Sequence, residues 1–229
     1  MSISVPSRPL TTNVPRLAQL MDEAGVDALV ASTPENVLYL TSMFSLSHWF
    51  IAGVECYAVV SRDRLDQPLL VFPIGDSDLV AEAGVQDLPL FPYGQFYVLP
   101  ATGSPHLAPD EEALARLAQA QTFGTPAEAL EAALADLAIA PGKIGVDSRG
   151  LTGGALHVVE RFAERSGAAI DKAGGDLILS ARMVKTPEEI RRLTHVAHVT
   201  EDAMQHVLNN AKEGMTETEA KRVFHAFLV

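Results

Sequence analysis

Short apolar runs of strand length alternate with amphipathic stretches of helical length from residue 14 to residue 172 of this 229-residue chain. The runs expected as buried strands are 27–32, 55–61, 68–73, 143–148 and 168–172. Segments with helix start and stop signals separate most of them, which is typical of helices packed on a parallel or mixed sheet. The sequence therefore predicts an α/β domain, with the Pro- and Gly-rich stretch 92–109 as a long loop.

The pattern changes after residues 174–186, "GGDLILSARMVKT", where two long amphipathic helices follow and no strand is expected. Both helices begin with the Thr-x-x-Glu spacing of a capping box, at Thr186–Glu189 and Thr216–Glu219. The sequence then ends on "HAFLV", whose apolar side chains need a partner surface. We therefore expect a fragment that stops soon after a second domain begins.

Composition excludes several classes of protein. A net charge of −12 repels phosphate backbones, so nucleic acid is not an expected partner. Cys56 is the only cysteine, which excludes an intrachain disulfide and a thiol-rich zinc site. No apolar run reaches the ~18 residues of a membrane span, and residues 1–15 lack the core of a signal peptide. We expect no membrane contact and a cytoplasmic location.

A histidine-rich stretch in the first of the late helices is a candidate metal site. Helical spacing puts His195, His198, Asp202 and His206 opposite an apolar face. That face consists of Ile190, Leu193, Ala197, Met204, Val207 and Leu208. Neighbours in the His198–Asp202–His206 row could share one ion, but no further ligands are evident. The preferred interpretation is a polar helix surface, with no metal ligand in the chain.

Glycines at 150, 153 and 154 lie between an expected strand and an expected helix, where backbone amides can approach a phosphate. Asp171 follows at roughly the ~20-residue offset of a ribose-binding acid. The spacing is G-x-x-G-G rather than G-x-G-x-x-G, which favours a tight turn and a helix start. A nucleotide-binding α/β module remains an alternative.

The segment 45–55, "SLSHWFIAGVE", contains the only tryptophan, Trp49, next to His48. It connects a helix to a strand, so it is expected as a loop at a sheet edge, where sites often form. The alternative is that the apolar residues 49–51 plug the core. Ser45 and Ser47 lack a nucleophile elbow, so no catalytic serine is predicted.

Two stretches resemble the creatinase/prolidase/aminopeptidase P family, whose catalytic domain has the pita-bread fold. The first is 16–44, with its Gly-Val-Asp-Ala-Leu strand and Pro-Glu-Asn-Val-x-Tyr-Leu-Thr turn. The second is 180–219, and it carries Arg182, Lys185, Thr186, Glu189, Ile190 and the Gly-Met-Thr-Glu turn at 214–217. Ser42 departs from the pattern, because many relatives have glycine there, and this leaves the subfamily open.

The resemblance implies a fold and a division of the chain. Residues 1–13 form a flexible arm, and 14–180 form an N-terminal domain with a ribonuclease H-like mixed sheet flanked by helices. A hinge at 181–186 leads to 187–229, the first two helices of a truncated pita-bread catalytic domain. Family enzymes hold two divalent metal ions (manganese, cobalt or zinc) with two Asp, one His and two Glu. No residue of this chain matches those positions.

The resemblance also implies a function. The chain is expected to be the non-catalytic N-terminal domain of an Xaa-Pro dipeptidase or aminopeptidase, inactive without the metal ligands of its parent. The parent is expected to be a homodimer acting on proline-containing dipeptides or peptides. His48 and Trp49 are predicted to contact the substrate cleft or the partner subunit. A creatinase-like or other small-molecule hydrolase or lyase on the same scaffold is the alternative.

Overall fold

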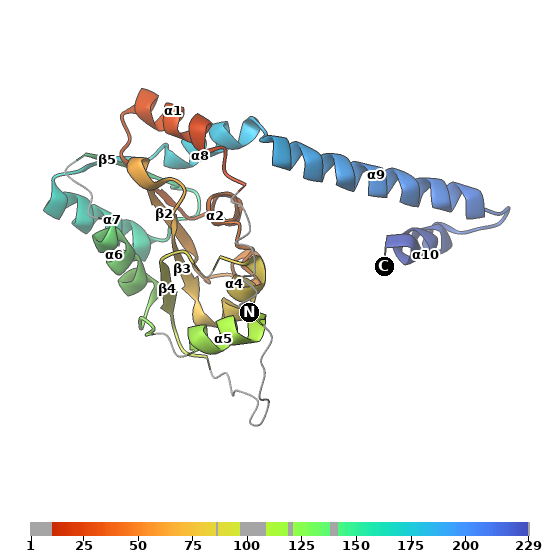
Figure 1. The fold of residues 1–229 in the computed structure, drawn as a ribbon, viewed down its shortest axis with the longest axis horizontal. Coiled ribbons are helices and arrows are strands. Elements are labelled where there is room, and N and C mark those ends of the chain that lie inside the picture. Colours follow the sequence, from red (N-terminus) through yellow and green to blue (C-terminus); the bar gives the residue numbers. More distant parts are fainter. Residues whose placement is uncertain (1–10, 86, 97–108, 119–120, 138–141, 229) are drawn as a thin grey trace, which may run out of the picture. The chain divides into compact units, whose positions relative to one another are not determined.

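The computed structural model describes residues 11–85, 87–96, 109–118, 121–137 and 142–228. The chain forms two compact units, Met1–Val184 and Lys185–Val229. The first unit contains the sheet, and the second contains two helices (Figure 1). The units divide within the segment 181–186 that was expected as a hinge.

A mixed sheet is the centre of the first unit (Figure 1). Within the described residues its strands are β1 (Ala28–Ala31), β2 (Tyr57–Ser61), β3 (Leu69–Pro73), β4 (Leu90–Tyr93), β5 (Lys143–Val146) and β6 (Ala169–Asp171). Their order is β4-β3-β2-β1-β5-β6. β2 runs antiparallel to both β1 and β3, whereas the other neighbouring pairs are parallel. The predicted α/β fold with a mixed sheet is confirmed.

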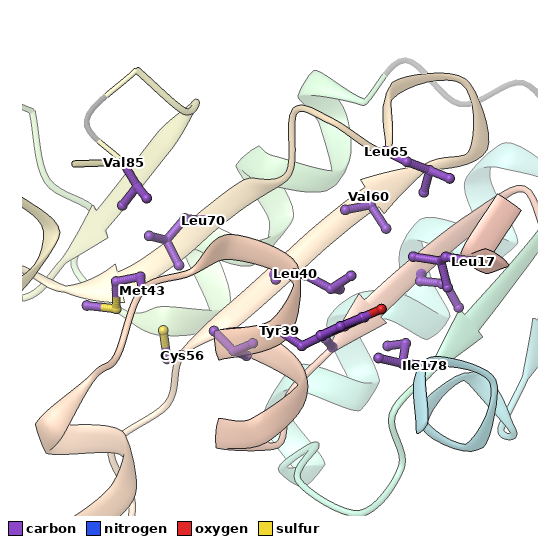
Figure 2. Packing of buried hydrophobic residues seen from close by; sticks show 14 of the residues in the cluster. Leu17, Tyr39, Leu40, Met43, Cys56, Val60, Leu65, Leu70, Val85 and Ile178 are labelled. Atoms are coloured by element: carbon purple, nitrogen blue, oxygen red, sulfur yellow. The ribbon is translucent and has the colours of Figure 1, made fainter. Parts of the chain in front are cut away.

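Helices cover both faces of the sheet and bury two apolar clusters. The first face packs against α1 (Val14–Ala24), α2 (Pro34–Thr41), α4 (Ser77–Ala83), α5 (Pro109–Ala118) and α8 (Gly174–Met183). Figure 2 shows this cluster, in which Tyr39 of α2 lies beside Ile178 of α8. The opposite face packs against α6 (Pro126–Asp136) and α7 (Gly153–Ser166). Cys56 is a fully buried member of the first cluster, and burial raises the pKa of its thiol.

Local capping residues define both ends of α1. Asn13 accepts a hydrogen bond from the Arg16 amide at the start of α1, and Gly25 ends that helix in the left-handed region at φ 62°. Thr12 donates to the Tyr39 carbonyl at 2.8 Å, so the last residues of the expected arm are bonded to α2. Residues 1–10 of that arm lie outside the described part of the chain.

Three elements differ from the expectations. β4 includes Pro92 and Tyr93, so the long loop expected at 92–109 was wrong at its start, and 97–108 lie outside the described residues. A short helix, α3 (Leu46–Phe50), occupies the segment expected as a loop, and Ser45 caps it. α8 continues through Met183, which makes 181–183 helical.

The second unit is a pair of packed helices, α9 (Pro187–Asn210) and α10 (Glu217–Leu228). The capping box of α9 is present, because Thr186 and Glu189 exchange hydrogen bonds of 2.8 and 3.1 Å. Ala203 is buried in this unit, and the ring of Phe227 on α10 lies 5.0 Å from that of His206. The predicted apolar face is largely exposed, with Ile190, Leu193, Met204 and Leu208 all more than half accessible to solvent.

Candidate functional site

Polar side chains gather at one edge of the sheet, where β1, β3 and β5 end and β2 begins. The chain leaves β1 into α2, which packs on the first face, and leaves β5 toward α7, which packs on the other. Connections that diverge to opposite faces open a crevice at the carboxyl ends of parallel strands, and ligand sites often form there. The candidate site is built from residues at this edge.

Asp147 directly follows β5 and is 1% exposed. Its Oδ2 accepts hydrogen bonds from the amide and hydroxyl of Thr33, at 3.0 and 2.6 Å, and from the side-chain amide of Asn36 at 2.8 Å. The Ser32 hydroxyl donates to the Asp147 carbonyl at 2.6 Å. Burial alone raises the pKa of the Asp147 carboxyl, but the bonds that the carboxylate accepts from Thr33, Asn36 and the Ser32 backbone amide outweigh burial and hold that pKa below its ordinary value. Asp147 is therefore a carboxylate at neutral pH.

The second carboxylate oxygen, Asp147 Oδ1, is buried and has no hydrogen-bond partner among the described residues. It lies beside Gly175 in the first turn of α8. A cavity of about 420 Å³ adjoins this group and is lined by Thr33, Glu35, Asn36, Asp147, Arg149, Gly175, Leu179 and Arg182. Arg182 donates to the Asn36 side-chain carbonyl at 2.9 Å, and Arg149 pairs with Asp176. The cavity thus carries both signs of charge.

Asp76 fixes α3 at the same edge. This buried carboxylate accepts from the hydroxyl of Ser45 at 2.5 Å and from that of Ser47 at 2.6 Å. Ser45 Oγ in turn accepts the His48 amide at 3.0 Å, which caps the helix. A five-residue helix is too short to be stable alone, so these bonds hold the segment in place.

His48 is half-buried on α3, and its ring interacts with the Ser32 backbone. Burial lowers the pKa of His48, and the Ser32 backbone with the carboxylates of Glu35, Asp76 and Glu55 offsets only part of that effect. The ring is therefore neutral at pH 7. Ser32 lies between His48 and Asp147, so His48 and Asp147 flank the same turn.

Trp49 lies on the outer side of α3 and is 39% exposed. Its ring stacks on Phe44, with centroids 5.8 Å apart. Trp49 is one of five exposed large apolar residues on and beside α3, which we call the α3 apolar surface: Phe44, Leu46, Trp49, Phe50 and Ile51. These exposures contradict the alternative in which residues 49–51 plug the core. What His48 and Trp49 contact stays a prediction.

The glycine-rich segment at 150–154 forms a tight turn and the start of α7. A β-carbon at Gly150 would lie 2.6 Å from the Ser32 carbonyl oxygen, so glycine permits a close approach of two backbones. Thr152 caps α7 by accepting the Ala155 amide, and Asp171 accepts the Ala173 amide at 2.9 Å. These contacts favour the tight-turn interpretation over a phosphate site.

The histidines of α9 do not belong to a set of metal ligands among the described residues. His195 and His198 are exposed, and His206 contacts Phe227. Across the described ranges, no group of three or more His, Cys, Asp or Glu residues is placed to hold a metal ion. The residues present in those ranges therefore do not fit a metal centre.

Sequence reasoning missed Asp147, Asn36, Arg182 and Asp76 as parts of a site. One signal for Asp147 was available: an acidic residue at the end of the expected strand 143–148, parallel to a strand that a Thr-Pro helix start follows. Asp76 gave no such signal, because its partners Ser45 and Ser47 are about thirty residues away in the sequence.

Comparisons with known proteins agree with this architecture. Residues 14–184 match the model of the creatinase/prolidase N-terminal domain. An Xaa-Pro dipeptidase from Bacillus anthracis superimposes with a TM-score of 0.55 at 16% identity, covering 94% of this chain and 47% of its own. A prolidase from Pyrococcus furiosus superimposes with a TM-score of 0.55 at 20% identity, and the match covers 94% of this chain and 52% of the prolidase.

An X-Pro aminopeptidase from Thermotoga maritima has a TM-score of 0.53 at 16% identity, covering 94% of this chain and 48% of its own. The chain thus spans about half the length of these solved structures. No curated protein matches the sequence. Among the described helices, none is both long and apolar enough to cross a membrane.

Proposed function

Since this chain belongs to the creatinase/prolidase N-terminal domain family, we propose that it is the non-catalytic N-terminal part of an Xaa-Pro-cleaving metallopeptidase. The similar structures with Xaa-Pro dipeptidase and aminopeptidase names support this choice of reaction. In this proposal the two divalent metal ions, manganese, cobalt or zinc, belong to the part of the parent beyond residue 229. The residues described here supply recognition and assembly.

The α3 apolar surface is the observation that carries the proposal. Large exposed apolar groups that lie side by side on a folded domain mark interaction sites. Here they lie on a short helix that the buried Asp76 carboxylate fixes to the sheet edge. A rigid aromatic surface of this kind suits contact with a partner subunit in a homodimer, or with an apolar peptide side chain in a cleft.

His48 gives this surface a polar contact. In the neutral ring one nitrogen donates and the other accepts a hydrogen bond. In this proposal one ring nitrogen of His48 donates to the Ser32 backbone, which leaves the other nitrogen as an acceptor. We propose that this nitrogen of His48 accepts a hydrogen bond from a peptide N–H or from a donor on the partner subunit.

Two assays test the proposed function. The 229-residue chain with added manganese or cobalt should not hydrolyse Xaa-Pro dipeptides, and hydrolysis would overturn the non-catalytic assignment. In the natural protein that carries this chain, Trp49→Ala should raise KM for an Xaa-Pro dipeptide while kcat changes little. Met183→Gln is the matched control, because Met183 is 73% exposed and lies on α8 rather than on α3.

A creatinase-like or other small-molecule hydrolase or lyase is the second candidate, favoured by the matching family model, whose description covers creatinase and prolidase alike. Fold similarity does not separate these reactions. Assaying the parent protein on creatine and on an Xaa-Pro dipeptide side by side separates them. Turnover of creatine alone would replace the peptidase assignment.

A further inference from the structure

Two hydrogen-bonded links join the end of the first unit to α2. Arg182, in the last turn of α8, donates to Asn36 of α2. The Val184 carbonyl accepts from the Asn13 side chain at 3.0 Å, and the Asn13 amide donates to the Tyr39 hydroxyl of α2 at 2.8 Å. Both links from the end of the first unit therefore lead to α2.

The start of α2 is in turn held by Asp147. Thr33, the residue that precedes the helix, gives both its amide and its hydroxyl to Asp147 Oδ2. Asn36 uses its side-chain amide for the same oxygen and its carbonyl for Arg182. A single carboxylate oxygen thus accepts three hydrogen bonds of 3.0 Å or less, and hydrogen bonds to a charged acceptor are the strong ones.

We propose that Asp147 is a positioning residue that fixes the start of α2 and, through Asn36 and Arg182, the point at which the chain leaves the first unit. Both ends of α8 are connected to the carboxylate of Asp147. Its first turn packs against Asp147 Oδ1 at Gly175, and its last turn reaches Asp147 Oδ2 through Asn36. The second unit begins at Lys185, directly after this helix and Val184.

Asp147 also positions the turn beside His48. The Ser32 hydroxyl binds the Asp147 carbonyl, and the Ser32 backbone interacts with the His48 ring. The hydrogen-bonded series Arg182–Asn36–Asp147–Ser32 therefore runs from the exit of the first unit to the base of α3. This assignment does not depend on the reaction of the parent protein.

Hydrogen exchange on the 229-residue chain tests the proposal. Asp147→Asn keeps the shape of the side chain but removes its charge. Amides in the first turn of α2 and the last turn of α8 should exchange about tenfold faster or more, because charge-assisted bonds to a buried carboxylate close those turns. Amides of α6 and α7, on the opposite face, should be protected as in wild type.

Asp176→Asn is the matched control, since it removes an exposed carboxylate from the same helix, and it should exchange like wild type. Arg182→Met removes the bond to Asn36 and leaves the Asp147 carboxylate in place, which keeps the test informative if Asp147→Asn does not fold. Arg182→Met should speed amide exchange in the last turn of α8 alone. Combining it with Asp147→Asn should add little to the exchange rate of that turn in Asp147→Asn. The proposal would be overturned if amides in Arg182→Met and Asp147→Asn exchanged as slowly as those in Asp176→Asn. It would also be overturned if the two changes had fully additive effects on exchange in the double variant.

Discussion

Gly175 leaves room for the buried carboxylate of Asp147: a β-carbon at position 175 would lie 2.4 Å from Asp147 Oδ1. Neither group can give way easily. The carboxylate is held through its other oxygen by Thr33 and Asn36, and Gly174 beside it packs on the backbone of β5. This contact sets the distance between α8 and the edge of the sheet.

Gly175→Ala should therefore lower the free energy of unfolding by about 1–3 kcal/mol, the usual range for overpacking a closely fitted site. Gly153→Ala is the control, because Gly153 also begins a helix and a β-carbon there would meet nothing within 4 Å. That variant should be neutral or stabilised by up to about 1 kcal/mol. Urea titration of both proteins measures the difference, and equal stabilities would show that α8 can move away from Asp147.

Asp147 should make stability depend on pH in the acid range. Its folded-state pKa lies below the ordinary 3.8, so the unfolded chain binds this proton more readily. The stabilisation is present above pH 3.8 and is lost as the pH falls through the lower, folded-state pKa. Asp147→Asn should be less stable than wild type by about 1–3 kcal/mol at pH 7, and this difference should shrink below pH 3.8. A difference that is constant with pH would contradict the charged role of Asp147.

His48 should titrate below the ordinary value of 6.5, because burial disfavours its charged form. The unfolded chain then binds the proton first, so the stabilisation is present above pH 6.5 and is lost as pH falls toward the folded-state pKa. The Cε1 proton of His48, followed by NMR, gives the midpoint directly. His48→Gln should remove this part of the pH dependence, whereas a midpoint above 6.5 would mean that the surrounding carboxylates outweigh burial.

Asp76→Asn should loosen α3 while the sheet stays folded. The change removes a buried charged acceptor of two serine hydroxyls, which costs about 1–3 kcal/mol of stability. Trp49, the only tryptophan, should become more accessible to acrylamide quenching as the helix frays. Asp78→Asn provides the control, because Asp78 is exposed on the next helix. Unchanged quenching in Asp76→Asn would show that the apolar contacts of α3 suffice.

The buried strands could be predicted because their apolar runs are local features of the sequence. β1, β2, β3 and β5 all lie within such runs. β4 was missed because its strand character depends on pairing with β3, in register from Leu70 with Leu90, whereas locally it contains Pro92. α3 was missed because it is only five residues long and is fixed by bonds from Ser45 and Ser47 to Asp76, a residue distant in the sequence.

The candidate site was less predictable than the fold. His48 and Trp49 drew attention as unusual residues next to each other, and the structure places both at the sheet edge. Asp147, Asn36 and Arg182 lie far apart in the sequence and meet only when β1 and β5 pair and α8 packs on α2. Such a group follows from topology, which a pattern of single residues does not contain.

Sedimentation velocity of the 229-residue chain tests most directly the claim that the α3 apolar surface serves assembly. Wild type and Met183→Gln should associate as concentration rises, while Trp49→Ala combined with Phe50→Ser should remain monomeric at the same concentrations. Phe50 and Met183 are 74% and 73% exposed, so the two changes remove similarly accessible side chains from different surfaces. Identical sedimentation of wild type and the Trp49/Phe50 variant would contradict the assembly role of the α3 apolar surface.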